Sequence, residues 1–73
     1  MKASSEEFYR VVGINIQAVR KRANISQEEL AELMNVTTRT IQNYEKGKFV
    51  SFYVIKNLSK IFNCDVNDFL MGL

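Results

Sequence analysis

Apolar residues recur at helical spacing along most of the chain. The first such segment covers about residues 6–22, and the positions that share its apolar face are Phe8, Val12, Ile16, Val19 and Ala23. A later segment, residues 52–62, repeats the pattern with Val54, Ile55, Leu58, Ile61 and Phe62. A short last segment opens at Asp65 and carries Val66, Phe69 and Leu70. The best strand candidate, residues 48–55, has no clean alternation and no partner strand.

The second segment carries a strong signal for a helix start. Ser26 followed three residues later by Glu29 is a capping box, and Ile25 with Leu30 has the spacing of a hydrophobic staple. Asn35 tolerates a left-handed backbone, so the helix is expected to end within residues 33–35. The residues that this helix is expected to turn inward are Leu30, Leu33 and Met34.

A third helix is predicted to begin almost at once. Thr37 is its expected cap, Glu45 is close to its last residue, and Gly47 stops it. A turn this short holds two helices at a steep angle, with the small Ala31 at their closest approach. The pattern therefore predicts an all-α fold of five short helices, with a helix-turn-helix at about residues 27–46.

Length and composition limit the function classes. Seventy-three residues suit one domain, 1–73, and the net charge of +2 is too small to indicate nucleic acid by itself. One cysteine, Cys64, and no histidine argue against an internal disulfide, a metal site and catalysis. No cofactor motif, signal peptide or membrane-spanning segment is apparent, which favours a cytoplasmic protein.

These features come together in "NISQEELAELMNVTTRTIQNYEKGK", residues 24–48, which resembles the Cro and phage-repressor-like helix-turn-helix family, also called XRE-type. Residues 11–24 and 58–70 are similar to that family's first helix and its last two. Three positions depart from the family: Asn35 and Asn63 stand where glycine is frequent, and no proline follows Lys48. Asparagine tolerates positive φ, so the missing proline is the larger departure.

The resemblance implies a lambda-repressor-like DNA-binding domain. Its function would be a sequence-specific, double-stranded DNA-binding transcriptional regulator, a repressor of bacterial or phage origin. Members bind near-palindromic operators as homodimers, with half-sites about 34 Å apart. Residues 37–45 would form the helix that reads the major groove.

Site residues are carried over from the resemblance by position. The residues implied to contact base edges are Gln27, Thr38, Arg39, Gln42 and Asn43. Those implied to contact phosphates are Gln27, Lys46, Gly47 and Lys48. Arg20 and Glu45 match an arginine and a glutamate that form a partly buried structural ion pair.

Two alternatives stay open. The chain is either a DNA reader or a helix-turn-helix protein-interaction module that binds an antirepressor or a toxin instead. Its apolar loop and weak net charge favour the second reading slightly. Residues 49–53 and the tail residues Phe69, Leu70, Met71 and Leu73 either form a dimer surface or close the small core.

Overall fold

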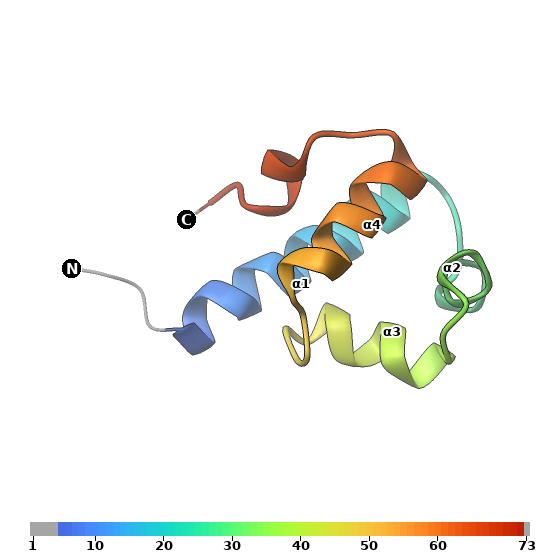
Figure 1. The fold of residues 1–73 in the computed structure, drawn as a ribbon, viewed down its shortest axis with the longest axis horizontal. Coiled ribbons are helices and arrows are strands. Elements are labelled where there is room, and N and C mark those ends of the chain that lie inside the picture. The colour runs from blue at the N-terminus through green and yellow to red at the C-terminus, as the bar shows by residue number, and fades with distance from the viewer. Residues whose placement is uncertain (1–4, 73) are drawn as a thin grey trace.

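The computed structural model describes residues 5–72, in which all regular secondary structure is helical and no strand occurs (Figure 1). Its elements are α1 (Ser5–Arg22), α2 (Gln27–Met34), α3 (Thr38–Glu45), α4 (Phe52–Phe62) and a 3₁₀ turn, η1 (Val66–Phe69). The all-α prediction is confirmed. The predicted count is corrected, because this range holds four α-helices and one 3₁₀ turn instead of five helices. Leu73 lies outside the described residues.

The last element is a 3₁₀ turn because it is four residues long and bonded at i to i+3. The Asp68 N–H donates to the Asp65 carbonyl, and the Leu70 N–H donates to the Asn67 carbonyl, both at 2.9 Å. The Asn15 side chain ties the turn to α1, since its Nδ2 donates to the carbonyls of Phe69 (2.9 Å) and Met71 (2.8 Å). Phe69 is therefore buried in the core and does not belong to a dimer surface.

The core receives a fully buried side chain from every element. They are Ile16 of α1, Leu30 of α2, Ile41 of α3, Leu58 of α4 and Phe69 of η1. Together they belong to one contiguous hydrophobic cluster. Among them, Ile16, Leu30 and Leu58 lie at positions that the sequence pattern predicts on inner faces.

Two positions expected on inner faces are exposed. Leu33 follows the buried Ala31 by two residues, which is about 200° around a helix, so it points away from the core and is 60% exposed. Ala23 lies beyond the end of α1 and is also exposed. Leu33 thus lies outside the narrow buried arc of the short α2, and Ala23 lies outside α1.

Two glycines bring the backbone of α1 against the end of α3. A Cβ on Gly13 would lie 2.6 Å from the Gly47 nitrogen and 2.7 Å from the Glu45 carbonyl oxygen. A Cβ on Gly47 would meet the Tyr9 carbonyl, and Gly47 also has φ +80°. Gly13 therefore marks a close backbone approach within α1. The contact fixes where α3 ends relative to α1.

Among residues 5–72, none of the helices combines the length and the apolar character needed to cross a bilayer.

Candidate nucleic-acid interface

The turn between α2 and α3 is short and fully capped. Ser26 and Glu29 form the predicted capping box at the start of α2, with bonds of 3.0 and 2.8 Å. Asn35 ends the helix in the left-handed conformation, at φ 57°. The Thr37 hydroxyl then accepts the Thr40 N–H at 3.1 Å, which starts α3. Local capping thus sets the angle between the two helices.

The outer face of α3 is polar and has no partner within residues 5–72. Its inner side holds the buried Ile41 and Tyr44. On the outer side Arg39 and Gln42 are exposed, and Thr38 and Asn43 are half-buried; within the described chain these four side chains make no hydrogen bond or ion pair. They therefore remain available to bind another molecule.

The loop after α3 offers two lysines, but its amides are already used. Lys46 and Lys48 are exposed. The Gly47 N–H donates to the Tyr44 carbonyl at 2.9 Å, and the Lys48 N–H donates to the Asn43 carbonyl at 2.8 Å. These two N–H groups are therefore satisfied within the loop, and a phosphate contact at Gly47 stays a prediction.

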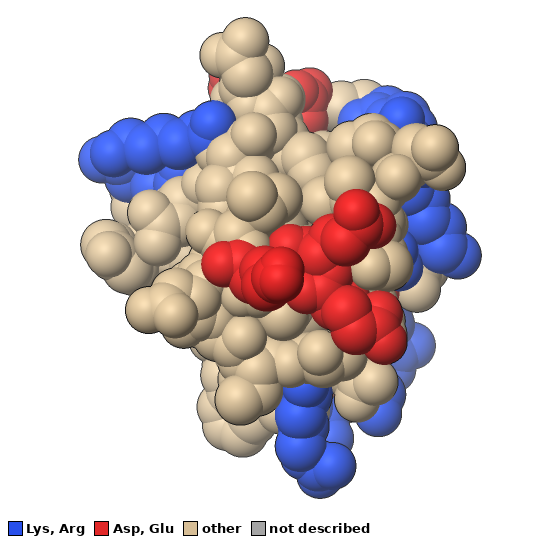
Figure 2. All heavy atoms as spheres, turned by 90° about the vertical axis from the view of Figure 1, so that its right-hand side faces the viewer, with Lys and Arg blue, Asp and Glu red and all other residues tan. Residues whose placement is uncertain are grey.

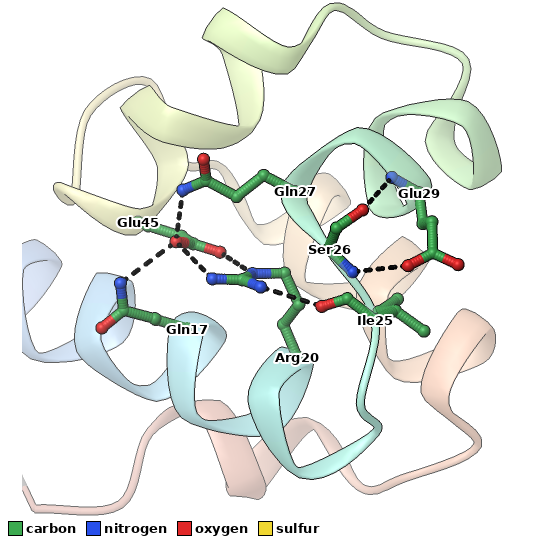
Figure 3. Close-up of polar contacts among 7 residues, drawn as sticks. All are labelled: Gln17, Arg20, Ile25, Ser26, Gln27, Glu29 and Glu45. Carbon is green, nitrogen blue, oxygen red and sulfur yellow. Dashed lines mark hydrogen bonds and ion pairs between the residues drawn. The ribbon is translucent and has the colours of Figure 1, made fainter.

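Glu45 lies at the centre of a polar cluster that joins three helices (Figure 3). Its Oε2 is 2.5 Å from Arg20 Nε, and both side chains are buried. Its Oε1 accepts from Gln27 Nε2 at 2.9 Å and from Gln17 Nε2 at 3.3 Å. Arg20 also donates to the Ile25 carbonyl at 2.8 Å, which fixes the connection between α1 and α2. The carboxylate thereby locks the end of α3 to α1 and α2.

Gln17 is a member of this cluster that the sequence reasoning missed. It lies three residues before Arg20, so both side chains share one face of α1. The three-residue spacing from Arg20 is the sequence feature that indicates Gln17 as a member of the cluster. The arrangement presents a polar helix face whose rear is fixed by buried contacts.

The sequence profile of a helix-turn-helix family matches residues 16–69, which is most of the chain. The chain belongs to this helix-turn-helix family. The match spans α1 from its middle to the 3₁₀ turn, so it includes the capped turn and the Arg20–Glu45 pair. The resemblance predicted from the sequence is confirmed.

Relatives of this helix-turn-helix chain carry regulator names. It is 37% identical over 57 residues to a putative HTH-type transcriptional regulatory protein of Pyrococcus furiosus, covering 77% of this chain and 18% of that protein. It is 39% identical over 59 residues to uncharacterized HTH-type transcriptional regulators of Sinorhizobium medicae and Rhizobium meliloti, covering 80% of this chain and 42% of each relative. The chain thus spans less than half the length of these relatives.

Charge is unevenly placed on this helix-turn-helix chain. Glu28, Glu29 and Glu32 are exposed on α2. Figure 2 shows acidic side chains gathered in the middle of the face where α2 lies, with basic side chains below and on both sides. The outer side of α2 would therefore repel a polyanion, whereas the exposed face of α3 carries Arg39 and no acidic residue.

Other site chemistry is sparse in the described part of the helix-turn-helix chain. Residues 5–72 contain no cluster of three or more histidine, cysteine or acidic side chains able to hold a metal. Cys64 is half-buried, and burial, followed by the nearby Asp68 carboxylate, raises the pKa of its thiol. The thiol is thus protonated at neutral pH and a weak nucleophile.

Proposed function

We propose that this chain is a sequence-specific, double-stranded DNA-binding transcriptional regulator, acting as a repressor, that reads the major groove with α3. The observation that carries the proposal is the outer face of α3, which is polar, unpartnered and held from behind by buried contacts. In a helix-turn-helix the N-terminal residues of the second helix approach base edges. Thr38 and Arg39 occupy that place.

Each exposed side chain has a suitable partner on DNA. Arginine bonds guanine O6 and N7, the amides of Gln42 and Asn43 suit adenine, and the methyl of Thr38 suits thymine. Lys46 and Lys48 provide charge for phosphates just beyond α3. The regulator names of the relatives support the same proposal.

Selection of bound duplexes from a random pool, with affinity measured against salt, tests the proposal. We expect a preferred sequence and an affinity that falls steeply with salt, because each neutralised phosphate releases counterions. Failure to enrich any duplex would contradict DNA reading. It would favour a protein-interaction module, which the exposed aromatic residues Phe49, Phe52 and Tyr53 also support.

Arg39→Ala is expected to weaken binding to the selected duplex roughly tenfold or more, because a bidentate arginine–guanine contact is worth about 1–3 kcal/mol. It should also relax the preference at one base pair. Titration of duplexes that vary this pair measures both effects. Lys60→Ala is the matched control, since it removes an exposed positive charge from α4. If both variants lost the same affinity, Arg39 would contribute only its positive charge and no base-specific contact.

We further propose that two copies bind a near-palindromic operator. The two half-sites of such an operator lie about 34 Å apart, a spacing comparable to the 38 Å long axis of the chain. Phe49, Phe52 and Tyr53 follow Lys48 closely in the chain and are 80%, 65% and 72% exposed. Three aromatic side chains bury at most roughly 150–250 Å² each. The combined area on each copy is therefore below the roughly 800 Å² per partner that a stable free dimer buries. The two copies are expected to pair on DNA.

Phe49→Gly has two expected effects, one on the backbone strain at residue 49 and one on the contact between two copies. Phe49 has φ 61°, a conformation that costs a bulky residue about 1–2 kcal/mol, so glycine should raise the melting temperature. The same variant should weaken assembly of two copies on a palindromic duplex, measured by analytical ultracentrifugation. Ile14→Ala, which alters an exposed residue of α1, should leave assembly unchanged. If Ile14→Ala weakened assembly and Phe49→Gly did not, the dimer contact would lie on α1.

A further inference from the structure

Gln27 occupies a position where its amide is held before any ligand arrives. It is the first residue of α2, and its Nε2 lies 2.9 Å from Oε1 of Glu45, the last residue of α3. The Glu45 side chain is buried and is itself fixed by Arg20 at 2.5 Å. Gln27 is half-buried, so part of its side chain still faces solvent. A side chain at the surface is thus fixed by a buried charge.

The chemistry of the two groups allows one orientation of this amide. A carboxylate accepts hydrogen bonds and cannot donate them, whereas a glutamine amide has two N–H donors and one acceptor oxygen. The nitrogen of Gln27 must therefore face Glu45. Figure 3 shows the carbonyl oxygen of Gln27 on the side of the amide away from Glu45. One N–H is satisfied by Glu45, and the second is left for another acceptor.

Building on the proposed DNA-binding function, we propose that Glu45 is a positioning residue for Gln27. By fixing the amide, Glu45 directs the second N–H to an acceptor on DNA, either a phosphate oxygen or a purine N7. A group held in its bound orientation pays less ordering entropy when the ligand arrives. The buried ion pair of Arg20 and Glu45 then serves DNA recognition as well as stability.

The first test compares affinities for the duplex selected with the wild-type chain. Gln27→Ala and Glu45→Ala should each weaken binding roughly tenfold, and the double variant should bind about as Gln27→Ala does, because each change removes the contact between these two side chains. Gln17→Ala is the matched control. It removes a longer bond of 3.3 Å to the same Oε1 and leaves the contacts of Gln27 and Arg20 in place.

The second test is independent of Glu45 variants, because Glu45→Ala also deprives Arg20 of its buried partner. In the NMR spectrum of the wild-type chain without DNA, one Gln27 side-chain N–H should already exchange slowly with water and lie downfield. Addition of the selected duplex should shift the other N–H. Two fast-exchanging, unperturbed signals would overturn the proposal, whatever the stability of the variants.

The results for Gln27→Ala also distinguish a phosphate oxygen from a purine N7 as the acceptor. They further distinguish failure of the role of Glu45 from failure of the DNA-binding function. A loss in Gln27→Ala that is equal for all sequences supports a phosphate acceptor, whereas a loss confined to one base pair supports purine N7. Wild-type affinity of Gln27→Ala, together with weak binding of Arg39→Ala, overturns the role of Glu45 and leaves DNA reading intact. If the wild-type chain selects no duplex, the proposed DNA-binding function is contradicted, and the role of Glu45 in DNA binding is contradicted with it.

Discussion

Arg20→Ala is expected to lower the free energy of unfolding by about 3–5 kcal/mol, because it leaves Glu45 buried without its partner. The Arg20 and Glu45 side chains are 9% and 4% exposed, so water does not replace the lost contact. The change also removes the donor to the Ile25 carbonyl. For a domain of this size the melting temperature should fall by about 12–40 °C.

Thermal unfolding followed by circular dichroism measures this loss, with Arg22→Ala as the control because Arg22 is exposed two residues further along the chain. A double variant, Arg20→Met with Glu45→Leu, should regain much of the loss, since apolar side chains often replace a buried pair without great cost. An unchanged melting temperature for Arg20→Ala would show that the pair contributes no stability.

Gly13→Ala is expected to destabilise the chain by about 1–3 kcal/mol or more, although alanine is favoured over glycine in helices by about 1 kcal/mol. The added Cβ would lie 2.6 Å from the Gly47 nitrogen, 2.7 Å from the Glu45 carbonyl oxygen and 2.9 Å from the Tyr44 carbonyl oxygen. All three atoms are backbone, so relief requires α3 to move away from α1.

Urea unfolding measures the effect of Gly13→Ala. Gly72→Ala is a useful comparison, because its Cβ would meet its nearest neighbour, a Val11 methyl, at 3.7 Å. Gly72 has φ +93°, so this variant should lose a smaller amount through backbone strain alone. A gain in stability for Gly13→Ala, as helix propensity alone predicts, would mean that the two backbones do not touch.

Sequence reasoning located the features that depend on local signals. The Ser26 and Thr37 caps, the left-handed Asn35 and the end of α2 follow from residue types at fixed spacing. It placed Leu33 inside because Leu33 and Leu30 share a helical spacing, but the spacing does not give the width of the buried arc. It counted a fifth α-helix because a four-residue turn with apolar residues has the same pattern.

The sequence predicted those parts of the site that follow from the type of side chain and from its position in the helix-turn-helix motif. Arg39 and Lys46 could be assigned to an exposed surface from polarity and periodicity. The use of the Gly47 N–H by the Tyr44 carbonyl could not, because it depends on how the chain turns after α3. The bond between Gln27 and Glu45 joins residues 18 positions apart, so it exists only once α2 and α3 have packed.

The side chains that hold α3 and those that face outward are separate sets. Ile41, Tyr44 and Glu45 fix the helix from behind, whereas Arg39 and Gln42 are exposed and make no hydrogen bond within residues 5–72. Exposed positions without partners tolerate substitution within about 0.5 kcal/mol. The outer residues of α3 can therefore be exchanged while the scaffold stays the same. One such scaffold can carry many different recognition surfaces, with stability and binding preference altered one at a time.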